Sequence, residues 1–531
     1  MKVSMKNAEI LTVVFLYLLA LYIWTLPIHE NRMPFGDVDA SSHFTIGDYM
    51  ASTDRSVAKI PYPITFRYGG QNTPLPEYIW YPPQYWTNGA IGQVLGGERI
   101  LPFFIFVAIF SSLIILSSYF LIRSLFGFWP AFLSSFLLIF STRDYMIYLW
   151  GQWPQSLSFA FTPLVLYSYF QYHRNYKEKI NKPVYLYFLA LFLAAQFFFH
   201  PQGMIASAGA LIIFNIILFA KDKRLSIDAK HAFLAFALFA ALSAALAPLN
   251  IGEFFVELAK PGDSDGGLQF DKLFKWYHGI RNDPGLPDFY FTYNMTHGSL
   301  AGGFLSWWTL PFLLLGILFL AYRRDDKDIL LLGWLVSFYF LTRLAVFGLG
   351  SRDIRMFAYE AHVFYPIIAI GLLSISSFFS NQEIKKFAKY GFIALFFILA
   401  LSINAKSAYD ILKGQQNSIA RINPMQYEAA LWLKDNVEER ADIYDIGTLG
   451  YQNFGAKIKW LMVLSQRHFI VNEPELRDAD YIFFDYTDGI LLGSREYVDA
   501  LQQIESQFSN ATPTYDQNNI RVYRINGIQQ G

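Results

Sequence analysis

The chain has 531 residues, of which 54% are hydrophobic and only 16% are charged. A soluble globular domain has about 25% charged residues, so this composition is typical of a membrane protein. The formal net charge of zero gives no global positive field that would indicate a nucleic-acid partner, and the absence of cysteine excludes disulfides and thiolate chemistry.

Apolar runs long enough to cross a bilayer follow one another along most of the chain. A helix needs roughly 20 residues to span about 30 Å of hydrocarbon. Such runs occur at 10–28, 100–122, 128–148, 155–172, 184–200, 202–220, 231–250, 303–321, 329–348, 357–378 and 390–405. The sequence therefore predicts a polytopic α-helical membrane protein with about eleven transmembrane helices. We expect the first run to be an uncleaved span, because it is too long for the core of a signal peptide.

Basic residues predict the orientation of these spans, because cytoplasmic loops carry an excess of Lys and Arg. If the spans alternate, the basic segments that fall on one side are Lys2 with Lys6, Arg123, 173–182, 221–224, 323–327 and 385–389. We therefore expect a multi-pass protein of the cell membrane with a cytoplasmic N-terminus. The loops 29–99 and 251–302 then lie on the external face.

After residue 405 the pattern changes to that of a water-soluble module. We expect two domains, 1–405 in the membrane and 406–531 on the external face. Asn423, Pro424 and Gln426 match the start of a helix, with a cap residue, a proline at the first helical position and a reciprocal partner three residues on. Short β-type runs follow at 443–446, 468–471, 481–485 and 520–525, with a further helix near 495–508. This pattern predicts a small external α/β domain.

The loop 29–99 carries two acids where an aqueous segment meets the bilayer, Asp37 and Asp39. A helix over 36–53 would place Asp39 and His43 four residues apart on one face. The proline-rich and aromatic stretch that follows favours a shaped surface that holds a sugar ring. A purely structural interpretation is also consistent with the pattern, with both acids capping the helix and His43 packed in the core.

This part of the chain resembles the GT-C superfamily of polyprenyl-phosphate-dependent glycosyltransferases. The residues that carry the resemblance are Gly36-Asp37-Val38-Asp39, His43, Gly69-Gly70, Pro74-Leu75 and Tyr81-Pro82-Pro83. Within the superfamily the chain looks most like prokaryotic, archaeal-type membrane proteins labelled 6-pyruvoyl-tetrahydropterin synthase-related. The resemblance implies a GT-C-like fold over nearly the whole chain, with Asp37 in the catalytic acidic position.

The chemistry of such an enzyme sets its own requirements. A base must take the proton of the acceptor hydroxyl as the new bond forms, and Asp37, with Asp39 beside it, suits this role. The departing lipid phosphate is already a stable anion and needs only cationic or amide contacts. We expect a polyprenyl-phosphate sugar as donor, inversion at the anomeric carbon, and a lipid-linked glycan, a cell-envelope polymer or a protein as acceptor.

A second external turn carries the candidate substrate-binding residues Arg143, Asp144 and Gln152. GT-C relatives often have a second acidic residue in this region, and either Asp144 or the segment at Gln152 would take its place. Whether a divalent cation such as Mg²⁺ or Mn²⁺ takes part stays open, and its ligands would be Asp37, Asp39 and Asp144. Arg143 and Asp144 would otherwise form an interfacial ion pair.

Other candidate substrate-binding residues are His200, Tyr81, Arg352 and Arg355. His200 lies at a polar break between two spans, where it would either face a cavity or simply belong to a hairpin turn. Arg352 and Arg355 lie in an arginine-rich external turn and are the preferred phosphate ligands. The alternative for the arginines is that they extend to lipid head groups.

Three other functions remain as alternatives to the glycosyltransferase. An oligosaccharyltransferase shares the architecture but normally carries a Trp-Trp-Asp-Tyr-Gly type motif, whereas Trp432 and Trp460 stand alone here. A lipid or glycan transporter would carry charged or helix-breaking residues near mid-membrane, and a non-enzymatic scaffold would only bind glycan or a partner. Motifs for nucleotide hydrolysis and zinc proteolysis are absent from the sequence.

Overall fold

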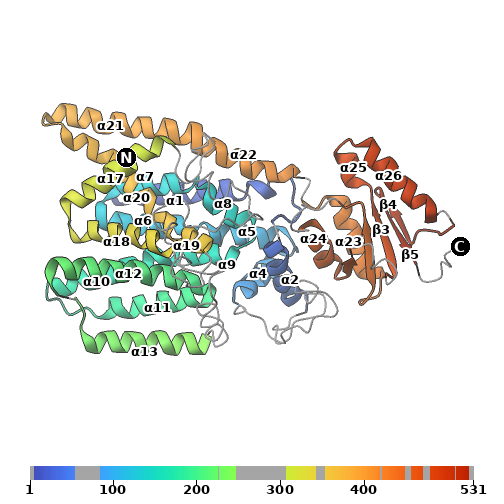
Figure 1. The fold of residues 1–531 in the computed structure, drawn as a ribbon, viewed down its shortest axis with the longest axis horizontal. Helices are drawn as coiled ribbons and strands as arrows, with labels where there is room; N and C mark the ends of the chain where they lie inside the picture. The colour runs from blue at the N-terminus through green and yellow to red at the C-terminus, as the bar shows by residue number, and fades with distance from the viewer. Residues whose placement is uncertain are drawn as a thin grey trace, which may run out of the picture.

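The structure is a computed structural model that describes residues 5–36, 38–53, 84–224, 226–246, 307–342, 353–418, 421–448, 456–470, 479–508 and 510–525. A large bundle of helices forms one part of the molecule, and a small sheet covered by helices forms the other (Figure 1). Helices α2 and α4 lie where these two parts meet.

The helices of the bundle are α1 (Met5–Trp24), α2 (Val38–Thr53), α4 (Gln84–Gly96), α5 (Leu101–Ser111), α6 (Leu113–Phe126), α7 (Phe128–Leu138), α8 (Thr142–Leu149), α9 (Trp153–Phe159), α10 (Phe161–Lys177), α11 (Val184–Phe199), α12 (Pro201–Asp222), α13 (Ala229–Leu246), α17 (Leu310–Arg323), α18 (Asp326–Leu341), α19 (Asp353–Glu360), α20 (Phe364–Ser374) and α21 (Gln382–Leu399). Short 3₁₀ turns, η1 (Leu26–Ile28) and η6 (Ala361–Val363), follow α1 and α19.

Six helical stretches among the described residues are long and apolar enough to cross a membrane. They are Asn7–Trp24, Leu101–Phe126, Pro201–Asp222, Ala229–Leu246, Met356–Phe378 and Gln382–Gly414. Shorter apolar helices, α7, α11 and α17, occupy three more of the predicted runs. The structure therefore supports a multi-pass helical protein, while the count of eleven spans stays a prediction.

Several of the predicted runs consist of more than one helix where the sequence suggested continuous spans. The run 128–148 consists of α7 and α8, and the run 155–172 of α9 and α10. The first break follows from a cap, because the side chain of Ser141 accepts a hydrogen bond from the backbone N–H of Asp144 at 3.4 Å and starts a new helix. Near the predicted domain boundary at 405, the helix instead continues through a π-helical stretch, Ala400–Ala405, into α22 (Lys406–Gly414).

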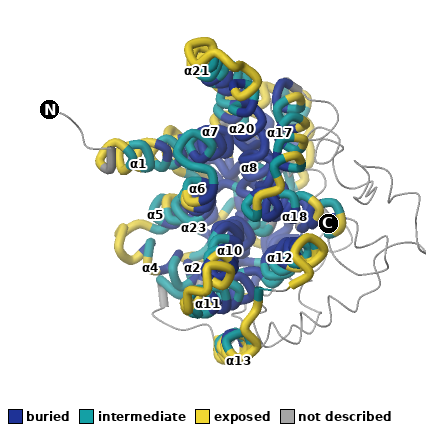
Figure 2. The backbone as a smooth tube through the Cα atoms, turned by 90° about the vertical axis from the view of Figure 1, so that its left-hand side faces the viewer, coloured by how far each residue is buried: buried dark blue, intermediate teal, exposed yellow. Residues whose placement is uncertain are grey.

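Burial separates an inner from an outer group of helices. We compare the candidate spans by the share of their 18-residue apolar window that is buried. This share is 78% in Met356–Phe378, 11% in Ala229–Leu246 and 22% in Gln382–Gly414. Figure 2 shows exposed residues on α1, α13 and α21 at the periphery, and buried residues on α8 near the centre. The polar turn that begins α8 is therefore inside the bundle.

The predicted basic segments that the structure describes gather at one end of the bundle, which we call the basic end. Asp326, at the start of α18, accepts hydrogen bonds from His173 Nε2 at 3.0 Å, Lys177 Nζ at 2.8 Å and Lys221 Nζ at 3.0 Å. The hydrogen bond from His173, followed by those from the two lysines, holds the pKa of the Asp326 carboxyl below its ordinary value although partial burial opposes this. Lys327 Nζ lies 5.4 Å from the ring of Phe126, which joins the end of α6 to the same cluster.

The C-terminal part of the chain contains, among the described residues, a five-stranded sheet with the order β2-β1-β3-β5-β4. The strands are β1 (Asp442–Ile446), β2 (His468–Ile470), β3 (Tyr481–Asp485), β4 (Tyr515–Gln517) and β5 (Ile520–Arg524), and its helices are α23 (Pro424–Asn436), α24 (Ala456–Ser465), α25 (Thr487–Leu491) and α26 (Arg495–Glu505). β1 pairs in parallel with β2 and β3, whereas β5 is antiparallel to β3. Asn423 and Gln426 form the predicted capping box at the start of α23.

Three carboxylates meet at the carboxyl ends of β1 and β3. Lys457 Nζ donates to Asp488 at 2.5 Å, and both side chains are fully buried. The hydroxyl of Thr448 lies 2.7 Å from a carboxylate oxygen of Asp445 and 3.0 Å from one of Asp485. Burial, together with the two neighbouring aspartates, raises the pKa of Asp445 well above its ordinary value. This network fixes α24 and α25 against the sheet.

Candidate functional site

The segment that enters α2 is fixed from three sides. Gly36, the residue before Asp37, has φ +103°, and a Cβ at this position would lie 2.6 Å from the Cβ of Ala40. Its carbonyl oxygen accepts a hydrogen bond of 2.9 Å from the indole N–H of Trp460 on α24. Asp37 itself lies outside the described residues, and Asp39 lies in the first turn of α2. The C-terminal part of the chain therefore contacts the acidic segment directly.

The turn between α8 and α9 packs against the same point. Gly151 has φ +81°, and a Cβ there would come within 2.1 Å of the backbone nitrogen of Ala40. Only a glycine can approach the start of α2 so closely without displacing it. Gln152 follows directly, and its side-chain oxygen is buried without a hydrogen-bond partner in the described part of the chain. Gln152 thus directly follows the glycine that packs against Ala40, the residue after Asp39.

His43 lies one helical turn after Asp39 and is 4% exposed. Its Nδ1 is 2.9 Å from the indole N–H of Trp86 on α4, and its ring also neighbours Tyr85 and Trp153. An indole N–H can only donate, so His43 Nδ1 accepts and carries no proton in this arrangement. The proton of a neutral imidazole then sits on Nε2. His43 is therefore a buried, oriented histidine rather than a solvated one.

Asp144 pairs with a residue that the sequence did not single out. His362, in η6, places its Nε2 3.1 Å and 3.3 Å from the two carboxylate oxygens of Asp144, and both side chains are 2% exposed. Arg143 is also buried, with its guanidinium 5.0 Å from the ring of Phe357 on α19. The predicted turn at 141–144 therefore joins α8 to the α19–η6 segment inside the bundle.

His200 occupies the polar break between α11 and α12 and is 4% exposed. Its ring centroid lies 5.8 Å from that of Tyr359, which in turn contacts Phe159 at 4.9 Å. Phe159 also contacts His362 at 4.9 Å. The break is thus both a hairpin turn and a buried contact, and it belongs to the same group of elements as Asp144.

Buried polar atoms without partners concentrate on these elements. Gln155 on α9 is 1% exposed, and neither atom of its amide has a hydrogen-bond partner among the described residues. Two more buried oxygens lack a hydrogen-bond partner among the described residues. They are the hydroxyl of Ser158, one turn further along α9, and one carboxylate oxygen of Glu360 on α19. Buried polar groups in native proteins nearly always have a partner. These groups therefore keep unused hydrogen-bonding capacity inside the bundle.

A buried arginine joins the first loop to the C-terminal part. Arg421 is 5% exposed, and its guanidinium donates to the backbone carbonyl oxygens of Pro27 at 2.5 Å, Asn31 at 2.7 Å and Pro34 at 3.0 Å, and also to that of Met33. Burial lowers the pKa of this guanidinium to about 9, which leaves it charged at pH 7. Arg421 therefore sets the path of the chain that leads to Asp37.

Besides Asp37, three more of the predicted site residues cannot be placed. Tyr81 and Arg352 lie outside the described residues, and Arg355 falls within α19 with its side chain outside the description. Among the residues that are described, no group of three or more His, Asp or Glu side chains is arranged to hold a metal ion. Because Asp37 is not among them, participation of a divalent cation stays a prediction.

The structure adds residues that sequence reasoning missed, chiefly His362, Gln155 and Arg421. Each lacks a local signal: His362 pairs with a residue 218 positions away, and Arg421 is a single arginine in a polar connection. Gln155 is a single amide at the start of an apolar run. Trp460, noted only because it stands alone in the sequence, proves to contact Gly36.

Solved structures with the same fold are glycosyltransferases of the GT-C superfamily. The archaeal oligosaccharyltransferase AglB from Archaeoglobus fulgidus, in complex with an inhibitory peptide and a dolichol-phosphate, superposes with a TM-score of 0.58 at 14% identity, covering 94% of this chain and 72% of AglB. ArnT from Cupriavidus metallidurans in the apo state gives a TM-score of 0.56 at 11% identity, covering 96% of this chain and 97% of ArnT.

The arabinofuranosyltransferase AftD from Mycobacteria gives a TM-score of 0.55 at 12% identity, covering 98% of this chain but 42% of AftD. At such low identities the likeness establishes the fold alone, and the fold of this chain is GT-C-like. No curated protein matches the sequence. One family model, described as a family of unknown function (DUF6541), matches residues 9–358. Because this match covers well over half of the sequence, the chain belongs to the DUF6541 family.

Proposed function

We propose that this protein is an integral-membrane glycosyltransferase that moves a sugar from a polyprenyl-phosphate donor to an acceptor hydroxyl on the external face of the membrane. One observation carries the proposal: in a GT-C-like fold, Gly151 packs directly against Ala40 at the start of α2, the residue that follows Asp39. The structures that share this fold include AglB with a dolichol-phosphate and ArnT bound to undecaprenyl phosphate.

The reaction is a single displacement at the anomeric carbon. The acceptor oxygen forms the new bond to that carbon as the bond to the lipid phosphate breaks, and the bonding electrons leave with the phosphate. The acceptor proton passes to a carboxylate, which we assign to Asp37 with Asp39 as the neighbouring acid. The phosphate leaves as a stable anion, so it needs cationic contacts, which Arg352 and Arg355 supply in this proposal.

The remaining buried polar groups suit the recognition of a sugar. Gln152 and Gln155 offer amide groups with unused hydrogen-bonding capacity, and His43 offers an imidazole of fixed orientation. Sugar hydroxyls both donate and accept hydrogen bonds, so amides are fitting partners. Asp144 is engaged with His362, and we therefore assign it a positioning role rather than direct contact with the substrate.

The donor class is tested by supplying the purified full-length protein, in lipid nanodiscs, with a panel of radiolabelled polyprenyl-phosphate sugars and mixed acceptor lipids and peptides. We expect transfer of label from one donor class, with inversion at the anomeric carbon. Retained configuration in the product would refute the single displacement. If no polyprenyl-phosphate sugar bound and none gave product, the proposed function would be wrong.

A further inference from the structure

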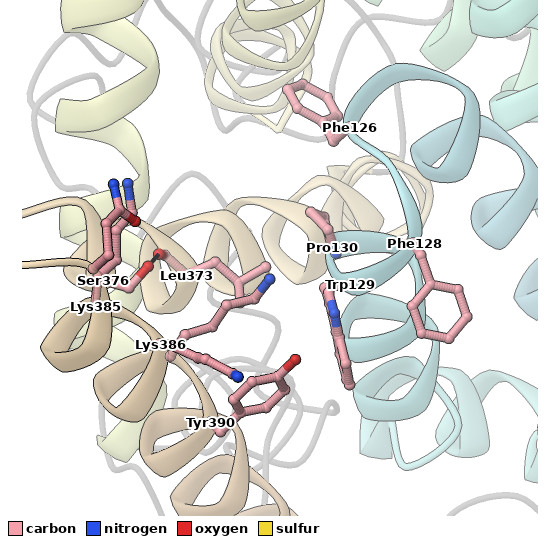
Figure 3. Close-up of a pocket in the computed structure, with 11 residues that line it drawn as sticks. Phe126, Phe128, Trp129, Pro130, Leu373, Ser376, Lys385, Lys386 and Tyr390 are labelled. Carbon is pink, nitrogen blue, oxygen red and sulfur yellow. Dashed lines mark hydrogen bonds between the residues drawn. The ribbon is translucent and has the colours of Figure 1, made fainter.

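A hollow lies at the basic end, and none of the residues that line it belongs to the candidate functional site. It has a volume of about 570 Å³ and lies between the beginning of α7 and the beginning of α21. Figure 3 shows Lys385, Lys386 and Tyr390 on one side of it and Trp129 with Pro130 on the other. In Figure 1 the beginning of α21 is at the end of the molecule farthest from the sheet.

Three lysines line the hollow without acidic partners. Lys385, Lys386 and Lys389 all lie within the first eight residues of α21, and none forms an ion pair with a carboxylate in the described part of the chain. Positive charges are unfavourable near a helix N-terminus, and the like charges of Lys385 and Lys389 are four residues apart on one face. An anion bound between them would relieve both repulsions.

The first backbone N–H groups of α21 already donate to the side chain of Asn381. An anion in the hollow would therefore be bound by side chains rather than by these N–H groups. Asn381 accepts hydrogen bonds from the backbone N–H groups of Glu383 at 2.9 Å and Ile384 at 3.3 Å. The lysine ammonium groups are therefore the charged donors that line the hollow. Ammonium groups bind phosphate as point charges and do not need the planar geometry that arginine requires.

The surroundings of the hollow match a membrane interface. Trp129 lies 5.8 Å from Lys389 Nζ and 6.2 Å from the ring of Tyr390, and such amphipathic rings are enriched at the level of lipid head groups. Next to the hollow, Phe387 is 82% exposed and Phe378 is 72% exposed. α21 also begins the candidate span Gln382–Gly414. Exposed apolar side chains beside a basic hollow suit acyl chains attached to an anion.

We propose that this hollow binds the phosphate head group of an anionic glycerophospholipid of the bilayer. A volume of about 570 Å³ accommodates a phosphate with its glycerol, while the acyl chains extend along the exposed face of α21. The lipid would hold the beginning of α21 against α7. This inference rests on the residues of the basic end and does not depend on the proposed catalytic function.

Native mass spectrometry of the full-length protein, titrated with phosphatidylglycerol, tests the site. We expect at least a tenfold loss of affinity for the tightest-bound lipid in a K385A/K386A/K389A variant. The triple arginine variant should keep that affinity, because it keeps the charge. The matched control is K179A/K182A, which removes two exposed lysines from the α10–α11 connection and should leave binding unchanged.

Two comparisons identify the ligand. Phosphatidylcholine, which has no net charge, should bind at least tenfold more weakly, and millimolar inorganic phosphate should not displace phosphatidylglycerol. Equal binding of the two lipids, displacement by inorganic phosphate, or unchanged phosphatidylglycerol affinity in the triple alanine variant would each overturn the proposal. If the triple variant does not fold, the single K386A variant in the exposed part of α21 gives the same comparison.

Discussion

Replacing Arg421 by methionine should loosen the segment that leads into α2. The guanidinium donates to four carbonyl oxygens of the segment 27–34, and its bonds to Pro27 and Pro34 are buried. A buried acceptor that loses its partner costs about 1–3 kcal/mol, so these two bonds alone predict a loss of about 2–6 kcal/mol in the local free energy of opening. The two partly exposed carbonyls can regain water.

Hydrogen exchange read by mass spectrometry over 29–36 measures this opening directly. We expect exchange to rise by at least tenfold in R421M and by less in R421K, whose ammonium keeps the charge but reaches fewer carbonyls. The matched control is R495M, which removes an exposed arginine from the first turn of α26. Unchanged protection of 29–36 in R421M would refute the conclusion that Arg421 fixes this segment.

Three further substitutions test the packing and the electrostatics. G151A should lower activity and reduce stability by about 1–3 kcal/mol, because its methyl group would overlap the backbone of Ala40. The control G391A should do neither, since nothing lies within 4 Å of that position. Thermal unfolding measures the stability of both variants, and a transfer assay measures their activity. Because the pKa of Asp326 is lowered in the folded protein, its contribution to the free energy of unfolding is complete above about pH 4 and is lost as the pH falls further. D326N should therefore lower the free energy of unfolding by about 1.5–3 kcal/mol at pH 7. Unfolding curves of the variant should also show less acid sensitivity than those of the wild type. The raised pKa of Asp445 has the opposite effect, because the free energy of unfolding then falls as the pH rises from about 4 through the raised pKa. D445N should flatten this part of the curve of stability against pH. An unchanged slope in D445N would contradict a raised pKa at Asp445.

The sequence predicted those features that depend on local patterns. The lengths of the apolar runs predicted the helical bundle. The basic segments between alternate runs predicted that these segments share one side, where Lys177 and Lys221 both donate to Asp326. The capping box at Asn423 and the short β-type runs predicted the start of α23 and the sheet. Each single span, basic segment, cap or strand in these features is encoded within about twenty consecutive residues, where period, charge and turn chemistry are visible.

The features that the sequence could not reveal depend on contacts between distant segments. The pairing of Asp144 with His362 joins α8 to η6, and nothing near either residue indicates the other. The close approach of Gly151 to α2 needs a positive φ, and a single glycine in the sequence does not predict that conformation. The C-terminal part looked like a separate module, yet Arg421 and Trp460 contact the segment that leads into α2. Tertiary packing thus decided how the site is assembled.

The central claim is that Asp37, the residue before α2 in the sequence, takes the acceptor proton, with Asp39 as the neighbouring acid. Single-turnover transfer from a prebound polyprenyl-phosphate sugar, compared in D37N, D39N and the exposed-acid control E30Q, tests it most directly. We predict that D37N lowers the rate about 10²–10⁴-fold with unchanged donor affinity, the range expected for loss of a general base. E30Q should match the wild type. A D37N protein that binds donor and transfers sugar at the wild-type rate would contradict the account.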